Sequence, residues 1–473
     1  MIDLSQFRGR SFGVLGLGRT GMATADALKA ADVKVVAWDD GLVGRSWAER
    51  GGIPLRRFAT EGLGDIDTLV LSPGIPRGYP RPHPVVQLAL DNDVRLISDI
   101  DLLAEAKPEA NFIGITGTNG KSTTTSLIGH LLANGGSPAE AGGNLGRPAL
   151  SLASLGADGW YVLEVSSYQL ETIEDVPWST GVFLNITPDH LDRYPDMDGY
   201  IAAKRRLFEG KGNQTAAIVG VDDEPSRKVA NALEAAGRRV VPISAIEPVD
   251  GGVSAVDGKL VDAIDSAPIE VFDLVGAPAL PGQHNWQNAA AAYAACRVAG
   301  LPSEKIVPGL ATFPGLMHRQ QTVAHVSGIR FVNDSKATNP DAAAKALGSY
   351  DTVYWIAGGR PKGTGFESLA PHLKRIRHAF LIGEAASDLA AFIDGASKGG
   401  CVPHSHCTDL DAATSAAFDA ALADGAENAV VLLAPACTSW DQFVDFEARG
   451  EAFIASVTAI AHRHQTQTLG GAA

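Results

Sequence analysis

A glycine turn between an apolar strand and a helix constrains the fold of this chain most strongly. The segment GITGTNGKSTTTSLI covers residues 114–128, and an apolar run leads into its glycines. After Gly120 the segment continues with Lys121, Ser122 and Thr123, which open a helical pattern. A strand, a glycine turn and a helix in this order place backbone N–H groups around an anion. The segment therefore predicts a phosphate-binding loop in an α/β domain.

The composition of this loop indicates a nucleotide with magnesium. In the common form of such a loop, the lysine reaches the outer phosphates and the next hydroxyl ligates Mg²⁺. The spacing here departs from that form, because Ile115 stands where the first glycine would be and Gly117 supplies an inner glycine instead. The strand before the turn and the helix after it are both correct, so we interpret the segment as a functional loop.

A second glycine turn, GLGRTG at residues 16–21, lies near the N-terminus, and Asp39 ends the strand that follows its helix. The G-x-G-x-x-G spacing brings backbone N–H groups close to a diphosphate in dinucleotide-binding units. Alone, it fits a dinucleotide, another nucleotide or plain tight packing. Asp39 is either a ribose partner or a solvated turn residue. The chain thus predicts two separate phosphate sites.

Polar residues end the strands predicted after the phosphate loop. Glu164 directly follows the apolar run YVL, where an unpaired charge would be costly, so a function is favoured. His190, in NITPDHLDRY, could equally cap a helix, and Lys204 could be one member of a solvated basic face with Arg205 and Arg206. Because the carboxyl ends of parallel strands meet at one edge of a sheet, we expect these polar strand ends to converge on one cleft.

Strands and amphipathic helices alternate from end to end, which predicts an α/β protein. At about 100–200 residues per domain, the 473 residues favour several domains. We place the boundaries near residues 98 and 315. The prediction is a Rossmann-like N-terminal domain (1–98), a P-loop-type central ATPase domain (99–315) and a Rossmann-like C-terminal domain (316–473).

The formal net charge of −15 argues against a nucleic-acid partner, because binding a polyanion requires concentrated Lys and Arg. We find neither a secretory signal pattern nor an apolar run of the about 20 residues that span a membrane. The 4 cysteines are too few and too scattered for a disulfide scaffold and are expected to be free thiols. We expect a cytoplasmic monomer that acts on a small molecule.

Eight segments together resemble the Mur ligase family, and they run in order along nearly the whole chain. They are GITGTNGKST, GGNLG, LEVSSYQLE, NITPDHLDRY, GQHNWQNA, HRQQTV, NDSKATNPDA and PACTSWDQFVDFEARG. Several are shared by all Mur ligases and by folylpolyglutamate synthases. LEVSSYQLE, NDSKATN and ACTSWDQFVDFEARG are similar to the family member that adds glutamate. The resemblance implies that the first turn holds the UDP of a sugar-peptide substrate, without a nicotinamide, and that the second holds ATP.

The activity implied by the resemblance is the ATP-dependent addition of D-glutamate to UDP-N-acetylmuramoyl-L-alanine during peptidoglycan precursor synthesis. A carboxylate is a poor electrophile, so the family first transfers the γ-phosphoryl group of ATP to it. The amine of glutamate then attacks the acyl phosphate and releases phosphate. Both steps develop negative charge on oxygen, so catalysis should rest on positioning and on cationic stabilisation.

The resemblance also implies residue roles around ATP. Lys121 contacts the β- and γ-phosphates, and two magnesium ions are expected, one at Ser122 and Glu164 and one at His190 and Lys204. An ammonium cannot ligate a cation, so Lys204 is expected to be carbamylated, as in the family. The expected ATP contacts are Gly117, Thr118, Asn119, Gly120, Lys121, Ser122, Thr123, Asn285, Arg319 and Asp334. Since the last two belong to the third domain, ATP should bridge two domains, and closure should exclude water.

For the UDP-linked substrate, the matching positions are Thr20, Asp39, Ser72, Gly74, Asn144 and Ser166. For glutamate they are Thr338, Lys362, Ser439 and Phe446, and a lysine with hydroxyls suits a dicarboxylate. Phe446 could equally be an ordinary packed aromatic. Enterobacterial members have threonine and arginine after the matching Asp39, whereas this chain has Asp40 and Gly41. A contact to the uridine part is therefore missing or replaced, with Arg19 as a candidate.

Three alternatives remain open from the sequence. A nicotinamide-dependent dehydrogenase would use GLGRTG but would leave the phosphate loop and the C-terminal motifs without a role. A non-catalytic nucleotide-binding relative would not need Lys121, Glu164 and Lys204 together. Within the ligases, another Mur ligase or a folylpolyglutamate synthase is the nearest competitor, separable by the acceptor and the amino acid that elicit phosphate release.

Overall fold

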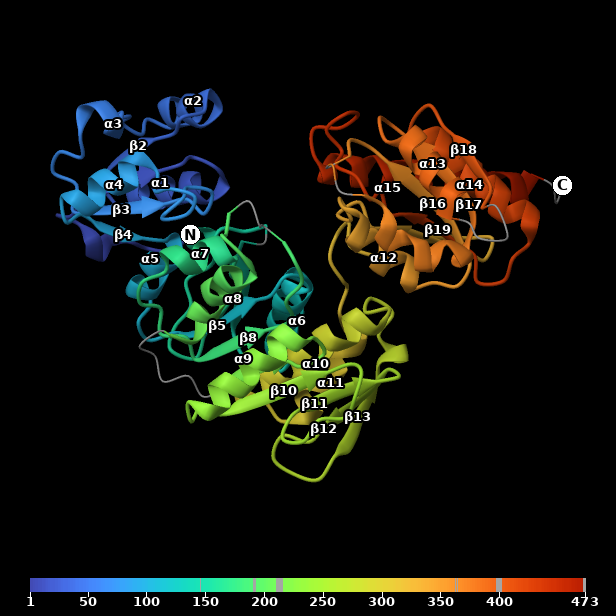
Figure 1. Cartoon of the computed structure of the whole chain (residues 1–473), viewed down its shortest axis with the longest axis horizontal. Coiled ribbons are helices and arrows are strands. Elements are labelled where there is room, and N and C mark those ends of the chain that lie inside the picture. The colour runs from blue at the N-terminus through green and yellow to red at the C-terminus, as the bar shows by residue number, and fades with distance from the viewer. Residues whose placement is uncertain are drawn as a thin grey trace. The chain divides into compact units, whose positions relative to one another are not determined.

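The computed structural model describes residues 1–144, 146–189, 193–209, 216–361, 363, 365–396 and 402–470, with side chains as far as residue 464. Its elements form three sheets, which confirms the predicted α/β class (Figure 1). The chain divides into two compact units. The first comprises Met1–Ala277 and Gln283–Phe313, and the second comprises Pro278–Gly282 and Pro314–Ala473. The first unit holds two of the sheets, and the domain boundaries near residues 98 and 315 stay predictions.

The first sheet has four parallel strands in the order β2-β1-β3-β4. Every residue of β1 and β3 is buried, as is typical of parallel strands that are covered on both faces. The strands are β1 Ser11–Leu15, β2 Lys34–Trp38, β3 Thr68–Leu71 and β4 Arg95–Ile97; the helices are η1 Ser5–Phe7, α1 Arg19–Ala30, α2 Leu42–Arg50, α3 Phe58–Glu61 and α4 Pro84–Asp91.

The second sheet has nine strands in the order β13-β12-β11-β10-β9-β8-β5-β7-β6, and only the pairs β11–β12 and β12–β13 are antiparallel. Strand β5 lies between β7 and β8, so the segments after these three strands begin side by side. The strands are β5 Asn111–Thr116, β6 Ala139–Gly143, β7 Trp160–Glu164, β8 Thr180–Phe183, β9 Ala216–Gly220, β10 Val240–Ser244, β11 Val253–Val256, β12 Lys259–Asp262 and β13 Ile269–Asp273.

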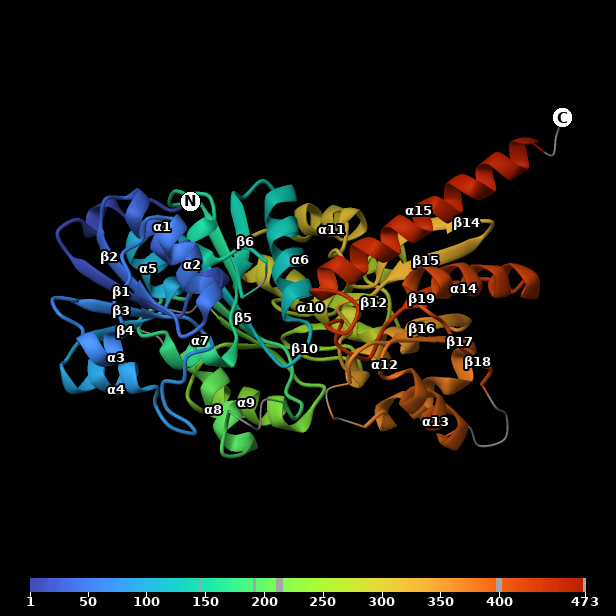
Figure 2. The same cartoon turned by 90° about the horizontal axis from the view of Figure 1, so that it is seen from above.

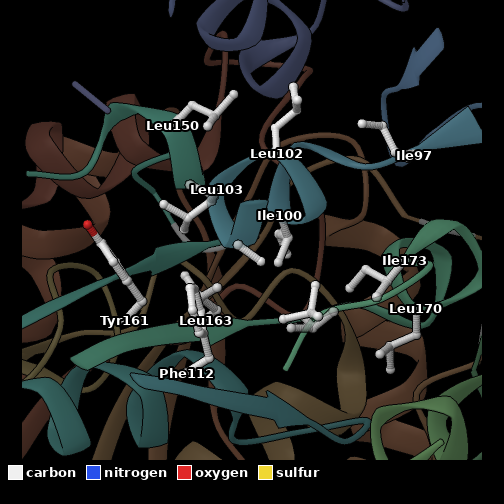
Figure 3. Packing of buried hydrophobic residues seen from close by; sticks show 14 of the residues in the cluster. Ile97, Ile100, Leu102, Leu103, Phe112, Leu150, Tyr161, Leu163, Leu170 and Ile173 are labelled. Carbon is white, nitrogen blue, oxygen red and sulfur yellow. The ribbon is translucent and has the colours of Figure 1, made fainter. Parts of the chain in front are cut away.

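The helices of this part are α5 Asp99–Ala106, α6 Lys121–Asn134, η2 Ala149–Ser151, α7 Ser167–Thr172, α8 Met197–Arg205, η3 Arg206–Phe208, α9 Glu224–Ala235, η4 Leu274–Gly276, α10 Gln283–Val298 and α11 Ser303–Thr312. Helix α5 is buried along nearly its whole length and joins the first two sheets into one hydrophobic core. Figure 3 shows its Leu103 near the strands that carry Phe112 and Leu163, whereas Leu102 points away from them. The shared core fixes the first sheet against the second.

Asp99, at the start of α5, has a buried carboxylate with weak hydrogen bonding. Ser98 and Asp101 form a capping box at the helix N-terminus. Asp99 is 1% exposed, and within the described part of the chain neither of its carboxylate oxygens makes a well-formed hydrogen bond. Burial raises the pKa of Asp99 to about 7, and the neighbouring Asp101 charge adds to the shift, against the pull of nearby backbone N–H groups. The ionised form of Asp99 is therefore destabilising in the folded chain.

Replacing Asp99 by asparagine should make the stability of the protein less dependent on pH. The folded state keeps the Asp99 proton up to about pH 7, whereas the unfolded chain loses it near 3.8. The stabilisation from this proton is complete below the unfolded pKa and is lost as pH rises through the folded pKa. Asp99→Asn should therefore raise the free energy of unfolding by up to about 4 kcal/mol over wild type near pH 8, and by much less near pH 5. Urea unfolding at both pH values checks this, and an equal difference at the two would contradict it.

The third sheet, in the second unit, has the order β14-β15-β19-β16-β17-β18, with only β14–β15 antiparallel. Separate hydrophobic clusters cover its two faces. Figure 2 shows α15 as one long helix at the end of the chain. The elements are β14 Gln321–Val326, β15 Ile329–Asn333, α12 Pro340–Gly348, β16 Val353–Gly358, η5 Glu367–Arg375, β17 Ile376–Ile382, α13 Ala386–Ala396, β18 His404–His406, α14 Leu410–Asp424, β19 Val430–Leu433 and α15 Phe446–Gly470.

Two further sequence predictions concern the whole chain. In the described ranges, none of the helices combines the length and the apolar character needed to cross a membrane. Cys296, Cys407 and Cys437 are free thiols, as expected, and Cys401 lies outside the described residues.

Candidate active site

The phosphate loop follows β5 and leads into α6, where the sequence predicted it. Gly117 has a φ of +149° and Gly120 a φ of +87°, a region that side chains rarely adopt. A Cβ atom at Gly120 would lie 2.2 Å from Asn288 Oδ1. The segment after β8 holds the loop, because Thr118 N–H donates to Asn185 O at 2.9 Å and Asn119 N–H donates to Asn185 Oδ1 at 2.9 Å. The loop is therefore shaped before any ligand binds.

Two lysine side chains converge on this loop. Lys121 Nζ donates to Gly117 O at 2.8 Å and to Thr118 O at 2.9 Å, and Lys204 Nζ donates to Gly117 O at 2.9 Å. Lys204 lies in the last turn of α8 and is only 2% exposed. The prediction from residues alone, a solvated basic helix face, is therefore wrong for Lys204. The apolar ring of Tyr200, 4.7 Å from Nζ, forms part of its enclosure.

Burial lowers the pKa of Lys204 well below its usual value, and the Lys121 charge lowers it further, against the carboxylates of Asp189 and Glu164. Each of these three charges therefore lies close enough to Lys204 to act on it. A lysine in this environment loses its proton easily and becomes a nucleophilic amine.

Glu164 ends β7, next to β5, and is 3% exposed. Its Oε1 accepts a hydrogen bond from Asn144 Nδ2 at 2.9 Å, so two residues that the sequence assigned to different ligands touch each other. Its Oε2 is buried and has no hydrogen-bond partner among the residues that the structure describes. A buried carboxylate oxygen of this kind is costly unless a cation pairs with it. With the buried Ser122 hydroxyl group in the first turn of α6, the donor set consists of oxygens, which suits Mg²⁺.

The base of the loop is linked to α10 through side-chain amides. Asn288 Oδ1 accepts from the Thr124 hydroxyl at 3.3 Å, and its Nδ2 donates to Asn285 Oδ1 at 3.1 Å. The predicted ATP contact Asn285 is 6% exposed and reaches the loop through Asn288. No role was predicted for Asn185 or Asn288, although they lie in the motifs NITPDH and HNWQN. The polar character of Asn288 within an alanine-rich buried helix was the available signal.

Two of the predicted substrate-binding residues form hydrogen bonds with the first glycine turn. Asp39 accepts hydrogen bonds from the N–H groups of Leu17 and Gly41, and Ser72 Oγ donates to Gly16 O at 2.7 Å. The structure thus brings Asp39 and Ser72 together against the turn. Thr20 follows in the first turn of α1, half-buried, and Gly74 is exposed in the loop after β3. Their binding roles stay predictions.

An arginine other than the expected one lies beside Asp39. Arg45 Nη1 donates to the carbonyl oxygens of Asp39 and Asp40, both at 2.7 Å, and its guanidinium lies 5.0 Å from the Trp38 ring centroid. Arg19, the sequence-based candidate, is exposed in the first turn of α1. Arg45 belongs to α2, and no sequence spacing connected it to Asp39.

Ser166 lies two residues beyond Glu164 and caps α7. Its hydroxyl accepts from Gln169 N–H at 3.2 Å, and Gln169 Oε1 accepts from Ser166 N–H at 3.0 Å, which completes a capping box. Both oxygens at this helix start are therefore positioned by backbone groups close to the Glu164 strand end.

In the second unit, Asp334 follows β15 and is 7% exposed. Gln320 N–H donates to its Oδ1 at 3.2 Å. Burial raises the pKa of Asp334 to about 7, and the Arg319 charge opposes this rise. The structure thus places the predicted ATP residues Arg319 and Asp334 close enough for their charges to interact.

The segments that carry Asp334 and Ser439 are held together by a buried arginine that our sequence analysis missed. Arg449 is 1% exposed, and its guanidinium donates to Ser335 Oγ at 3.0 Å, Ser335 O at 2.9 Å and Cys437 O at 3.2 Å. Ser439 is buried two residues beyond Cys437. Arg449 therefore fixes both segments from the start of α15.

Phe446, half-buried at the start of α15, packs against a cation rather than in an apolar cluster alone. Lys336 Nζ lies 3.7 Å from its ring centroid, and the His318 ring meets it edge-on at 6.3 Å between centroids. Thr338 N–H donates to Lys336 O at 2.7 Å, so Lys336 contacts two residues of the expected glutamate pocket, Thr338 and Phe446. Lys336, in NDSKATN, had no role in the sequence analysis. His190 and Lys362 lie outside the described residues, so their roles stay predictions.

Two family models match the chain. The Mur ligase middle domain covers residues 115–296, and the Mur ligase, glutamate ligase domain covers residues 318–437. These matches cover both the phosphate loop with Lys204 and the segment from His318 to Cys437. The chain belongs to the Mur ligase family.

Curated relatives extend this likeness over the whole chain. A protein of Rhodospirillum rubrum named "UDP-N-acetylmuramoylalanine--D-glutamate ligase" is 50% identical over 100% of this chain and 99% of its own length. A protein of the same name from Paramagnetospirillum magneticum is 49% identical over 96% of this chain and 97% of its own.

Solved structures support the fold. The UDP-N-acetylmuramate-alanine ligase MurC from Thermotoga maritima has a TM-score of 0.58 at 16% identity, and the match covers 95% of this chain and 99% of that one. MurF from Acinetobacter baumannii has a TM-score of 0.55 at 17% identity, covering 84% and 86%. At such identities the likeness establishes the architecture only.

Proposed function

We propose that this chain is an ATP-dependent amide ligase that adds D-glutamate to UDP-N-acetylmuramoyl-L-alanine in peptidoglycan precursor synthesis. The observation that carries the proposal is the convergence of Lys121 and Lys204 on one phosphate loop, beside the buried and half-paired carboxylate of Glu164. The full-length likeness to relatives that carry this name selects the substrates. The dehydrogenase alternative gains no support from either family model.

The first chemical step is phosphoryl transfer from ATP to the alanyl carboxylate. The N–H groups of the loop bind the phosphates, and Lys121 exchanges the carbonyl oxygens of Gly117 and Thr118 for the outer phosphate oxygens. The positive charge then lies where the transferring group gains negative charge. Magnesium at Ser122 and Glu164, and a second ion at His190 and Lys204, would supply further charge neutralisation. Asn285, Arg319 and Asp334 complete the proposed set of ATP contacts.

The buried amine of Lys204 suits carbamylation. Its lowered pKa favours the neutral form, whose lone pair can attack the carbon of CO₂. A C–N bond forms, one C=O π bond opens to a carboxylate, and the nitrogen loses a proton to water. The product is an anion with oxygen donors in place of a cation. This change removes the repulsion between Lys204 and Lys121 and lets residue 204 contribute to a cation site.

In the second step, the amine of glutamate attacks the acyl phosphate and expels phosphate. We propose that Thr338, Lys362, Ser439 and Phe446 hold glutamate, with Lys336 as an added cation for its carboxylates. The turn at residues 16–21 with Thr20, Asp39, Ser72 and Gly74 holds the UDP part, while Asn144 and Ser166 face the sugar-peptide end. We further propose that the chain acts as a monomer in the cytoplasm, where ATP and UDP-linked precursors are supplied.

The function is tested by phosphate release from the purified chain with ATP and Mg²⁺. We expect release only when UDP-N-acetylmuramoyl-L-alanine and D-glutamate are both present. L-glutamate in place of D-glutamate, and UDP-N-acetylmuramate with L-alanine in place of the pair, should give background rates. Equal rates with the two glutamate enantiomers, or turnover with the second pair, would overturn the proposed substrate assignment.

A further inference from the structure

Two arginine side chains form hydrogen bonds between segments that belong to the first and second sheets, one from each side. Arg77 lies in the loop after β3, and its Nη1 donates to Glu171 O and Thr172 O at the end of α7, both at 3.2 Å. Arg193 lies just before α8, and its Nη2 donates to Ile75 O at 3.2 Å, in the loop that carries Arg77. Each of the two segments therefore supplies a guanidinium that donates to backbone carbonyl oxygens of the other segment's sheet region.

Arg193 is held tightly. Its side chain is 11% exposed, its guanidinium lies 4.8 Å from the Tyr168 ring centroid, and Nη2 lies 3.8 Å from Glu171 Oε2. Nη1 reaches Gly74 O at 3.5 Å. A planar guanidinium can stack on a ring and donate to two carbonyls at once, which a lysine ammonium cannot do. Neither arginine has a role in the proposed chemistry itself.

The elements that these arginines join each carry a residue of the proposed site. The loop after β3 carries Ser72 and Gly74, and Ser166 caps α7. Helix α7 has only six residues, so a hold on its last carbonyls also fixes its first residue. Beyond the shared core, these contacts therefore help to set the loop after β3 against the start of α7.

We propose that Arg77 and Arg193 are positioning residues that form a reciprocal clasp, which sets the acyl end of the UDP-linked substrate against the phosphate loop. This inference rests on the proposed function. The long substrate must reach from the first sheet to the second, and a shift of about 1 Å at the attacking carboxylate oxygen is costly for phosphoryl transfer. The clasp affects the position of the UDP-linked substrate. ATP is bound by the phosphate loop, and its binding does not depend on the clasp.

The test measures steady-state kinetics of the full chain as wild type, Arg193→Ala, Arg193→Lys, Arg77→Ala and the double alanine variant. Arg193→Ala should raise KM for the UDP-linked substrate about tenfold and lower kcat about tenfold, with KM for ATP within about twofold of wild type. Arg193→Lys should recover only part of the loss. Both arginines fix the same loop after β3. The fold-loss of kcat/KM in the double variant should therefore be smaller than the product of the two single-variant fold-losses.

Arg50→Ala, at an exposed arginine that ends α2, serves as the matched control and should behave as wild type. If KM rises equally for ATP and for the UDP-linked substrate, if the single losses multiply fully, or if Arg193→Ala is fully active, the clasp is overturned. Absence of D-glutamate-dependent phosphate release in wild type would instead overturn the proposed function. Far-UV circular dichroism melting shows whether each variant is folded, and Arg193→Lys, which keeps the charge beside Glu171, carries the test if an alanine variant unfolds.

Discussion

Lys204→Ala should lower the ligase turnover of this chain by about 1,000-fold or more, equivalent to roughly 4 kcal/mol of transition-state stabilisation. The lysine is 2% exposed, bonds to Gly117 O and is electrostatically linked to Lys121 and Glu164, so its loss leaves a buried gap at the phosphate loop. Turnover is measured as phosphate release with both substrates saturating.

Rescue separates carbamylation from simple packing. If residue 204 acts through carbamate oxygens, short carboxylates such as acetate or formate should restore part of the activity of Lys204→Ala, and alkyl ammonium ions should not. In wild type, labelled bicarbonate should give a carbamate carbon resonance that the variant lacks. Unchanged turnover in Lys204→Ala would refute a catalytic role, and rescue by ammonium alone would refute the carbamate.

Gly120→Ala should weaken ATP binding strongly while leaving the rest of the fold in place. The residue has a φ of +87°, and its new Cβ would lie 2.2 Å from Asn288 Oδ1, so the loop or α10 must shift. Positive φ alone costs an alanine about 1 kcal/mol, and the clash adds displacement of the phosphate-binding N–H groups. We expect an increase in the Kd for ATP of about 100-fold or more, measured by calorimetry on the purified chain.

Gly136→Ala is the matched control, because Gly136 has a φ of +92° but a Cβ atom there would meet nothing within 4 Å apart from its chain neighbours. It bears the same backbone strain without the contact to Asn288. The control should therefore lose a little stability and keep ATP affinity. Equal losses of ATP affinity in the two variants would show that backbone strain, and not the Asn288 contact, controls the loop.

Much of the site could be predicted because it follows strands directly. The phosphate loop lies between β5 and α6, and Glu164 ends the neighbouring strand, since a parallel sheet gathers its strand ends at one edge. Lys204 shows the limit of such reasoning. Its basic neighbours indicated a solvent-facing helix face, whereas the packing of α8 buries it. The sequence pattern of one helix does not reveal which neighbour covers it.

Residues whose hydrogen-bond partners lie far away in the sequence were the hardest to predict. Arg449 lies 114 positions from Ser335, and Asn288 lies 164 positions from Thr124. Neither spacing corresponds to a helical or strand period, so only the assembled fold brings the partners together. The contact of Arg45 with the Asp39 carbonyl was not predicted for a related reason, since the start of α2 sets the direction of Arg45.

The burial of α5 has a practical consequence for dissecting this protein. A truncation at residue 98 would separate Ile97 from other members of its hydrophobic cluster, including Ile100 and Leu103, and would leave exposed apolar surface prone to aggregation on both fragments. An excision after Phe313 spares that helix and both of its flanking sheets. The smallest piece worth expressing for work on the first glycine turn is accordingly the first 313 residues, and not the first sheet by itself.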